Sequence, residues 1–427
     1  MNTKLKIALI RRYSNQGFAL PLAVGMGFVM LLIATTLMMR SQGDQTTALA
    51  QKATAQGLGT AETGVTRVQS FLSKNPGFLT QSYPWTTYLT NLRTSCTSGT
   101  LYSEAANFND WITVGNGNDR FKVISYTPSV TEGVLLVEGQ TRQGSNVKST
   151  SRIQVNIPFD RTRQPLFDPP GVWAQNFGLG NNRITGNVID ASCPPGSLDT
   201  DETSQISGTV TNNPGLTLPP SLPVPTVCTG SQQYPNDCGA MPLNAITSDL
   251  TLPRNSDNAN TNGEYIYYVA KSGNDSIDLS GNNKLVIKPG TKVRLYLEGN
   301  INTQGGQTKI GHNCYDTSNP PDGESDGATQ VSGCTPTNFQ MFGGIGTTSI
   351  IFGGGNTVDA FIFAPNAVRS GVNGGAQIRG SIWLKEWDRA NGSHTVVVQT
   401  TAWNNIPTSL WPARISPISS WQRQETP

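Results

Sequence analysis

The stretch Gly17–Met39, which reads GFALPLAVGMGFVMLLIATTLMM, decides the architecture of this chain. It lies within an uncharged run, 13–39, and as a helix it would be about 34 Å long, enough to cross a bilayer. Arg40 closes the run on its C-terminal side. The basic residues that precede the run are Lys4, Lys6, Arg11 and Arg12. Positive charge before a span keeps that end cytoplasmic, so the C-terminal bulk is predicted to lie outside.

Two other interpretations of this stretch are disfavoured. A cleavable secretory signal has an apolar core of about 7–15 residues that ends at small residues, and this run is longer and lacks such a site. A buried core helix would not explain why a basic head and a bilayer-length run coincide. An uncleaved signal anchor remains open beside the processed form described below.

The composition favours an exported protein rich in β-structure and turns. Of 427 residues only 14% are charged, against about a quarter in ordinary soluble proteins, while Gly reaches 45 and Pro 27. The net charge of +2 offers no field to steer nucleic acid, so no nucleic-acid partner is predicted. His312 and His394 are the two histidines, which argues against histidine-dependent catalysis and histidine-rich metal sites.

The N-terminal residues resemble a known family. A short basic leader, then Gly17-Phe18 and an apolar helix, resembles the class III leader of type IV pilins and pseudopilins. The sequence AETGV at 61–65 resembles the end of the first helix in PilX-like minor pilins. The resemblance implies that prepilin peptidase removes residues 1–17 and that Phe18 is then N-methylated. Residues 18–40 would form the transmembrane segment of a single-pass protein in the bacterial inner membrane.

One departure from the family pattern bears on function. Most major pilins carry Glu at the fifth mature position, and here that position is Leu22. An intramembrane carboxylate is costly unless a partner charge offsets it, and in the family that partner is a neighbour's N-terminus. The resemblance therefore implies a minor pilin or pseudopilin. Its expected partners are prepilin peptidase, other pilins or pseudopilins, the pilus assembly platform and the inner membrane.

Residues 41–158 are predicted to form a pilin-like helix packed on a small antiparallel sheet. An apolar face with three- and four-residue steps predicts that the helix continues to Lys74, and Asn75-Pro76-Gly77 ends it. Gly57, Gly59 and Gly64 lower helix propensity, so a bend is expected there. β-type runs follow at 121–126, 134–138 and 152–157. The Pro- and Arg-rich stretch 159–170 is interpreted as a linker.

Residues 171–405 are predicted to form a large all-β domain resembling a parallel β-solenoid. Short apolar runs end repeatedly in Gly-Asn or Gly-Gly, and the pairs Gly186/Gly208 and Gly281/Gly299 are each about one solenoid coil apart. A β-sandwich with Gly-Asn hairpins is the alternative. Residues 213–225 (NPGLTLPPSLPVP) predict an extended surface segment, and 406–427 a C-terminal tail. The fold class is therefore α+β.

Six cysteines in an exported chain predict disulfides. The short loops favour Cys228–Cys238 and Cys314–Cys334, which leaves Cys96 and Cys193 to pair, although 15 pairings are formally open. A zinc site is disfavoured because no C-x-x-C occurs and the histidines do not cluster with the cysteines in sequence.

Signals for a ligand are weak. The acidic stretch Asp316–Gly327 offers oxygen ligands for Ca²⁺, but a solvated loop is the favoured interpretation. Trp383 and Trp387, beside charged residues, are candidate carbohydrate contacts, although inward packing is favoured. No catalytic motif, metal site or cofactor site is predicted.

The function expected from these features is that of a non-enzymatic minor pilin or pseudopilin. It would serve a type IV pilus or a type II secretion-like machine and display its β domain for adhesion, motility or secretion. The alternative is a signal-anchored carbohydrate-binding or carbohydrate-active protein with a surface polysaccharide as partner.

Overall fold

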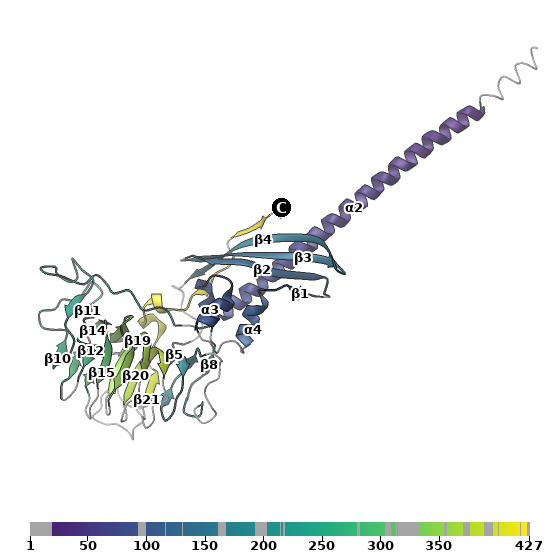
Figure 1. Cartoon of the computed structure of the whole chain (residues 1–427). Helices are drawn as coiled ribbons and strands as arrows, with labels where there is room; N and C mark the ends of the chain where they lie inside the picture. Colours follow the sequence, from purple (N-terminus) through teal and green to yellow (C-terminus); the bar gives the residue numbers. More distant parts are fainter. Residues whose placement is uncertain are drawn as a thin grey trace, which may run out of the picture.

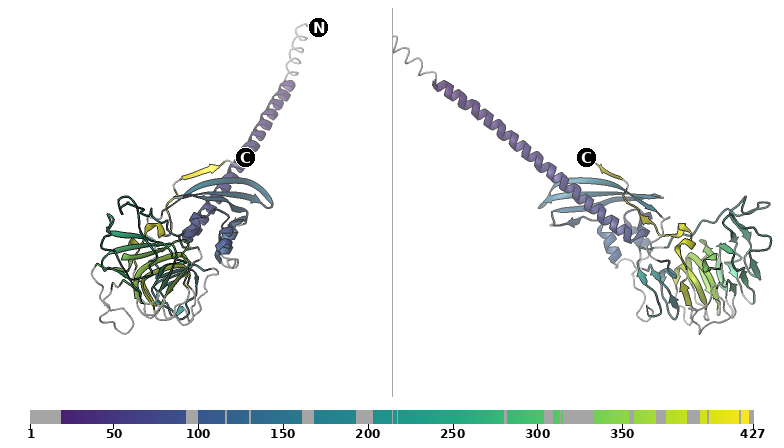
Figure 2. Two further views of the ribbon diagram at one scale, coloured as in Figure 1. Left: turned by 60° about the vertical axis from the view of Figure 1, so that its left-hand side comes forward. Right: turned by 180° about the vertical axis from the view of Figure 1, so that it is seen from behind.

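The structure is a computed structural model, and it places a long helix, an antiparallel sheet and a strand-rich body in that order (Figures 1 and 2). The helix projects away from the rest of the chain in every view, and the sheet covers its inner half. The described residues are 19–92, 100–115, 117–129, 131–160, 168–192, 203–213, 215–216, 218–279, 282–303, 309–312, 314, 333–353, 357–369, 376–387, 396–399, 401–418 and 420–424.

Helix α2 (Ala19–Lys74) is one continuous helix of 56 residues. All its residues from Ala19 to Lys52 are exposed, and its buried residues begin at Gly57. It ends before Asn75, as the Asn-Pro-Gly sequence predicts. The short helices that follow are η1 (Pro76–Thr80), α3 (Trp85–Leu92) and α4 (Thr100–Asn107).

The inner half of α2 packs on an antiparallel sheet, as expected. The strands, in spatial order, are β1 (Ile112–Val114), β2 (Asp119–Pro128), β3 (Glu132–Gln143) and β4 (Asn146–Asp160). Alternate residues of these strands, such as Phe121, Val137 and Val155, are fully buried in one core with Val65 and Val68 of α2. The period-two pattern of the strands thus meets the apolar stripe of the helix.

Described residues between 414 and 424, within the predicted C-terminal tail at 406–427, return to this sheet and pair with it, which the prediction of a tail did not include. Strands β22 (Arg414–Ile415) and β23 (Ser420–Gln424) both pair antiparallel with β4. The sequence SWQRQ lacks the apolar alternation that marks a strand, and its backbone pairing with β4 supplies the structure that its side chains do not predict. β4 itself extends to Asp160, into the predicted linker.

The second unit is a parallel β-solenoid, which excludes the sandwich alternative. Its strands pair in parallel, and Gln340, Phe361 and Ser381 occupy the same position in successive coils. Their spacing of about 20 residues is one coil. The strands of the principal face, in spatial order, are β8 (Val210–Asn212), β7 (Val188–Asp190), β5 (Val172–Phe177), β20 (Gln377–Trp387), β19 (Thr357–Arg369), β17 (Phe339–Gly343), β14 (Lys292–Leu297), β11 (Glu264–Val269) and β9 (Met241–Leu243).

Shorter strands complete the coils around an apolar interior. One group is β12 (Asp275–Asp278), β15 (Asn300–Thr303) and β18 (Ser349–Phe352). The other strands are β10 (Leu250–Leu252), β13 (Leu285–Ile287) and β16 (Ile310–Gly311), together with β6 (Arg183–Thr185) and β21 (Val396–Gln399). Val293, Leu295 and Leu297 alternate inward from β14 and are fully buried there.

The order of the coils does not follow the order of the chain. β5, the first strand of the unit, pairs with β20 on one side and β7 on the other. The chain therefore enters the stack at an inner strand, the third from one end, builds outward to β8, and resumes at the opposite end with β9. The extended segment predicted at 213–225 connects these two ends, and its described residues form no helix or strand.

The Gly-Asn pairs hold neighbouring coils together. Gly208 lies so close to Gly186 that a Cβ at Gly208 would be 2.2 Å from the Gly186 carbonyl oxygen. The Asn187 side-chain oxygen accepts a hydrogen bond from the Thr209 N–H at 3.0 Å, across to the next coil. The Asn300 side-chain oxygen likewise accepts hydrogen bonds from the N–H groups of Thr348 and Ser349. The glycine permits contact between coils and the asparagine satisfies exposed backbone donors.

Candidate interaction surfaces

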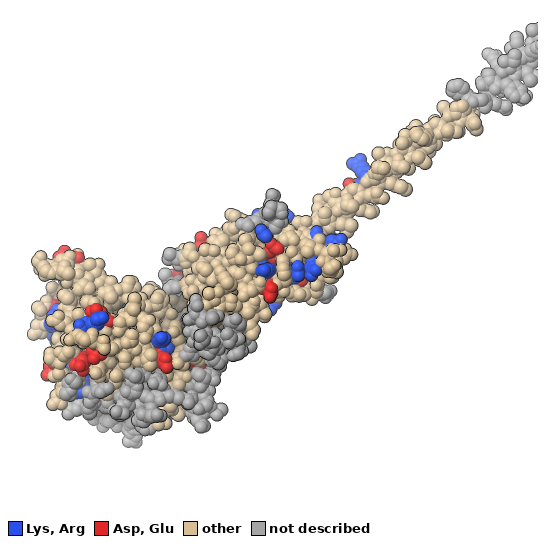
Figure 3. Space-filling model, in the orientation of Figure 1, with Lys and Arg blue, Asp and Glu red and all other residues tan. Residues whose placement is uncertain are grey.

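The largest surface without a partner in this chain is the outer half of α2. Its 18-residue apolar window is wholly unburied, and by length and composition α2 is the one helix of the described residues able to span a membrane. Figure 3 shows this segment almost without charged residues, whereas charges of both signs are scattered over the rest of the visible face. Its large apolar side chains, each at least 52% exposed, are Leu20, Leu22, Val24, Met26, Phe28, Val29, Met30, Leu31, Leu32, Ile33, Leu37, Met38 and Met39.

The hydroxyl groups within this segment are satisfied by the helix itself. Thr35 donates to the Leu32 carbonyl at 3.0 Å, and Thr36 donates to the same carbonyl. A hydroxyl bonded to its own helix presents little unsatisfied polarity to an apolar environment. The segment is therefore suited to lipid or to the apolar faces of other helices.

The leader lies outside the described residues, as do Gly17 and Phe18. Cleavage after Gly17 and methylation of Phe18 stay predictions.

Close packing holds the inner half of α2 on the sheet, where a bend was expected. A Cβ at Gly64 would lie 2.7 Å from the Phe121 ring, and one at Gly139 of β3 would lie 2.3 Å from the Gly57 carbonyl oxygen. Gly59 faces open space. Of the three glycines at which a bend was expected, Gly57 and Gly64 therefore serve helix–sheet contact. α2 remains a single helix through all three. The supported half is the fixed base from which the apolar half projects.

The solenoid is tied to the C-terminal end of α2. Asn213 donates its side-chain amide to the Lys74 carbonyl at 3.0 Å, and the Gly77 N–H donates to the Gly215 carbonyl at 2.9 Å. The last carbonyls of a helix lack partners within it, so the Asn213 bond caps α2 with a loop of the solenoid, and the Gly77 bond adds a backbone link just beyond the helix. Asn75 is buried against Gly215 in the same contact.

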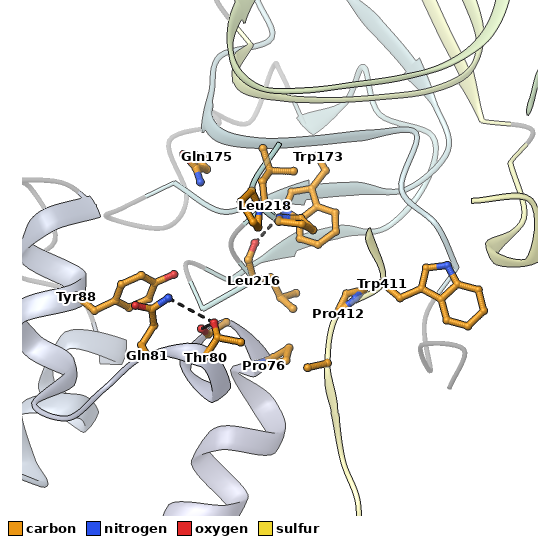
Figure 4. A pocket seen from close by; sticks show the side chains of 14 residues that line it. Pro76, Thr80, Gln81, Tyr88, Trp173, Gln175, Leu216, Leu218, Trp411 and Pro412 are labelled. Atoms are coloured by element: carbon orange, nitrogen blue, oxygen red, sulfur yellow. Dashed lines mark hydrogen bonds between the residues drawn. The ribbon is translucent and has the colours of Figure 1, made fainter. Parts of the chain in front are cut away.

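A cavity of about 430 Å³ lies at this junction (Figure 4). Trp173 lines the cavity, but its indole N–H is not available to a ligand. The side chain is 1% exposed, and the N–H already donates to the Leu216 carbonyl at 2.9 Å. The lining residues are Pro76, Gly77, Thr80, Gln81, Tyr88, Trp173, Gln175, Leu216, Leu218, Pro219, Pro220, Trp411, Pro412 and Ala413. None of these described lining residues is Asp, Glu, Lys, Arg, His or Cys.

The candidate carbohydrate contacts Trp383 and Trp387 are buried, so the structure shows the inward packing that the sequence favoured. Trp383 is 0% exposed and Trp387 1% exposed, and the Trp383 indole donates to the Pro170 carbonyl at 3.0 Å. The principal solenoid face carries a second apolar cluster on its outer side, which includes Trp383, Trp403 and Leu410. The chain from Trp403 to Trp411 thus covers the face that a sugar would need.

Both favoured disulfides are present: Cys228 is bonded to Cys238, and Cys314 to Cys334. Cys96 and Cys193 lie outside the described residues, as does the acidic stretch 316–327.

His312 lies directly beside the second disulfide, so the expectation that the histidines stay apart from the cysteines is wrong. The His312 Nε2 atom is 3.6 Å from Cys314 Sγ and 3.5 Å from Cys334 Sγ. Burial lowers the pKa of His312, and its hydrogen bond to the Asp359 carbonyl only partly opposes that effect. Asp359, 0% exposed, also accepts the Cys314 N–H and forms an ion pair with Arg379 at 2.7 Å. His312 and Cys314 are two residues apart in the sequence, whereas coil stacking brings Asp359 and Arg379 to them from more than 40 residues away.

Comparison with known proteins adds little beyond this geometry. Residues 246–401, less than half of the chain, match a family described as "Domain of unknown function (DUF7305)". No curated protein matches the chain. Among solved structures, the competence-associated pilin ComZ from Thermus thermophilus aligns over 87% of this chain and 97% of its own, with 12% identity and a TM-score of 0.25. At that TM-score neither fold nor function can be transferred from it.

Proposed function

We propose that this protein is a pilin-like subunit, held in a membrane by the outer half of α2 and displaying its solenoid outside. The observation that carries the proposal is the division of α2 into a half that builds a core and a half that touches nothing. The exposed stretch from Ala19 to Lys52 is about 51 Å long, more than a bilayer core requires. The remainder suffices to hold the sheet clear of the membrane.

The energetics support a lipid or helical environment for this half. Burying one large aliphatic or aromatic side chain contributes about 1.5–3 kcal/mol, and thirteen such side chains of the span are exposed. A membrane supplies this burial to a single subunit, and a bundle of like helices supplies it in a fibre. The same helix can therefore serve a membrane-held state and an assembled state.

A minor pilin or pseudopilin fits the span better than a major subunit. The described part of the span, from Ala19 to Met39, carries no carboxylate that would pair with a neighbour's N-terminus. The proposed partners are prepilin peptidase, other pilins and the assembly platform, and the proposed location is the bacterial inner membrane. The role in adhesion, motility or secretion needs no catalysis, and we propose that the protein is not an enzyme.

Processing tests the proposal. The full chain would be produced in cells with and without prepilin peptidase, and its N-terminus determined by mass spectrometry. We expect a mature chain that begins at N-methylated Phe18 only with the peptidase, and no cleavage in Gly17→Ala. Gly25→Ala is the matched control, because no atom lies within 4 Å of the Cβ that alanine would add there, and it should be processed normally.

An intact Met1 in peptidase-competent cells would contradict the pilin-like assignment and leave a plain signal anchor. Assembly has its own readout. Sheared surface fibres from a competent strain should contain the processed chain in small amounts, whereas Gly17→Ala should remain in the membrane fraction.

A further inference from the structure

Three potential metal ligands converge in the interior of the solenoid. His312 Nε2, Cys314 Sγ and Cys334 Sγ all lie within 4.8 Å of one another, and the three residues are 0%, 0% and 1% exposed. His312 follows β16, and Cys334 precedes η3 (Pro336–Asn338). The other disulfide, Cys228–Cys238, has no histidine in such a group among the described residues.

The hydrogen bonding of His312 fixes which ring nitrogen is free to bind. Its Nδ1 atom lies 2.5 Å from the Asp359 carbonyl oxygen, which can only accept, so Nδ1 carries the proton. In a neutral ring Nε2 then holds a lone pair, and this lone pair faces two sulfur atoms. A disulfide has no proton to donate, so the oxidised state does not satisfy a fully buried acceptor. Metal-binding histidines carry this same Nδ1–H to carbonyl bond.

We propose that His312, Cys314 and Cys334 form a Zn²⁺ site when the Cys314–Cys334 disulfide is reduced. Zn–S bonds of about 2.3 Å and Zn–N bonds of about 2.0 Å in a tetrahedron place nitrogen and sulfur about 3.5 Å apart. The observed separations are 3.6 Å and 3.5 Å. The two sulfurs would move to about 3.8 Å from each other, which requires the S–S bond to be open.

The surroundings suit a thiophilic cation. Two thiolates and one Zn²⁺ leave no net charge in the interior, and the nearby Asp359–Arg379 pair is neutral as a unit. The Asp359 carboxylate is engaged by the Cys314 N–H and by Arg379, so it does not compete for the metal. Among the described residues the group has three protein ligands, one nitrogen and two sulfurs.

The conversion balances as follows. A dithiol reductant transfers two electrons and two protons to the disulfide and becomes a disulfide itself, which yields two thiols in the protein. Zn²⁺ then displaces both thiol protons as it binds. Reoxidation would release the ion, so the same two sulfurs alternate between a covalent bond and a metal site.

The test uses the full chain in detergent micelles, with and without a phosphine reductant, under anaerobic conditions. Bound zinc would be measured after gel filtration, and Co²⁺ substitution would report sulfur ligation by its charge-transfer absorption. Compared with the double variant Cys228→Ser/Cys238→Ser, the reduced double variant Cys314→Ser/Cys334→Ser should bind one fewer Zn²⁺ per chain. The Cys228→Ser/Cys238→Ser variant should retain the charge-transfer band.

His312→Ala keeps both cysteines, so it tests the site even if a serine variant fails to fold. It should weaken zinc binding at least about tenfold in the reduced protein and leave the disulfide intact in the oxidised protein. Failure of the reductant to open the disulfide in the folded chain would overturn the proposal. So would zinc binding that is equal in the two serine variants, or unchanged in His312→Ala.

Discussion

The contact between α2 and the sheet makes a quantitative prediction for Gly64→Ala. The added Cβ would lie 2.7 Å from the Phe121 ring and 2.8 Å from Val137 Cγ1, well inside van der Waals contact. Overpacking of this kind costs about 1–3 kcal/mol. Alanine also gains about 1 kcal/mol over glycine in a helix, which obscures the sign of the effect in Gly64→Ala alone.

Gly59→Ala removes that ambiguity. It makes the same substitution on the same helix, and no atom lies within 4 Å of its Cβ. The propensity gain cancels between the two variants, so Gly59→Ala should exceed Gly64→Ala in stability by about 1–3 kcal/mol, the cost of overpacking.

Amide hydrogen exchange in β3 is the appropriate assay, because the two units need not unfold together. Exchange there should be about 5–150-fold faster in Gly64→Ala than in Gly59→Ala, while exchange in β14 of the solenoid stays the same. Equal exchange in the two variants would refute the argument that Gly64 is needed for close contact.

Three further predictions concern single residues. Asn300→Ala removes the acceptor for the Thr348 N–H, so exchange of that amide should accelerate by the equivalent of about 0.5–1.5 kcal/mol, and unchanged protection would contradict the bond between coils. Burial raises the pKa of Tyr83 to about 12; its folded pKa exceeds the unfolded value, so the stability it contributes is present below about pH 10 and is lost as the pH rises toward 12. Urea midpoints should therefore fall less steeply over that range in Tyr83→Phe than in the wild type. Asp359→Asn leaves Arg379 buried without its counter-charge and should lower the free energy of unfolding by about 3–5 kcal/mol in urea melts, whereas a loss below about 1 kcal/mol would argue against the ion pair.

Local patterns predicted the elements whose burial follows a simple period. The uncharged run predicted the exposed half of α2, three- and four-residue steps predicted its packed half, and period-two alternation predicted β2 to β4. The spacing of the Gly-Asn sequences predicted the coils, and Gly186 and Gly208 do lie on top of one another in neighbouring coils. Each of these signals lies within a few residues of the structure it describes.

Features that depend on distant partners were not predictable in this way. β23 is a strand because β4 offers an edge, and β5 joins β20 across some two hundred residues of chain. The sequence around Trp383 does not indicate that the segment from Trp403 to Trp411 covers it. The candidate metal site is different, because His312 lies two residues before Cys314 and the predicted Cys314–Cys334 disulfide places the second sulfur beside it. Only Asp359 and Arg379, which are distant in sequence, depend there on the stacking of coils.

The unusual order of the coils has a mechanical consequence. Chain leaving the first unit at β4 and chain returning to it at β22 connect to inner coils of the stack, where β5 and β20 are neighbours. Through the covalent chain, a load applied along α2 would thus reach the solenoid at an inner coil, in addition to the end coil that Asn213 and Gly215 tie to α2. Once the bonds to Asn213 and Gly215 give way, the load acts on β5, which has a parallel partner on each side, so both strand pairs must shear before β5 comes free. A domain carried on a retracting or tensioned fibre would gain resistance to force from this arrangement, with no additional contacts.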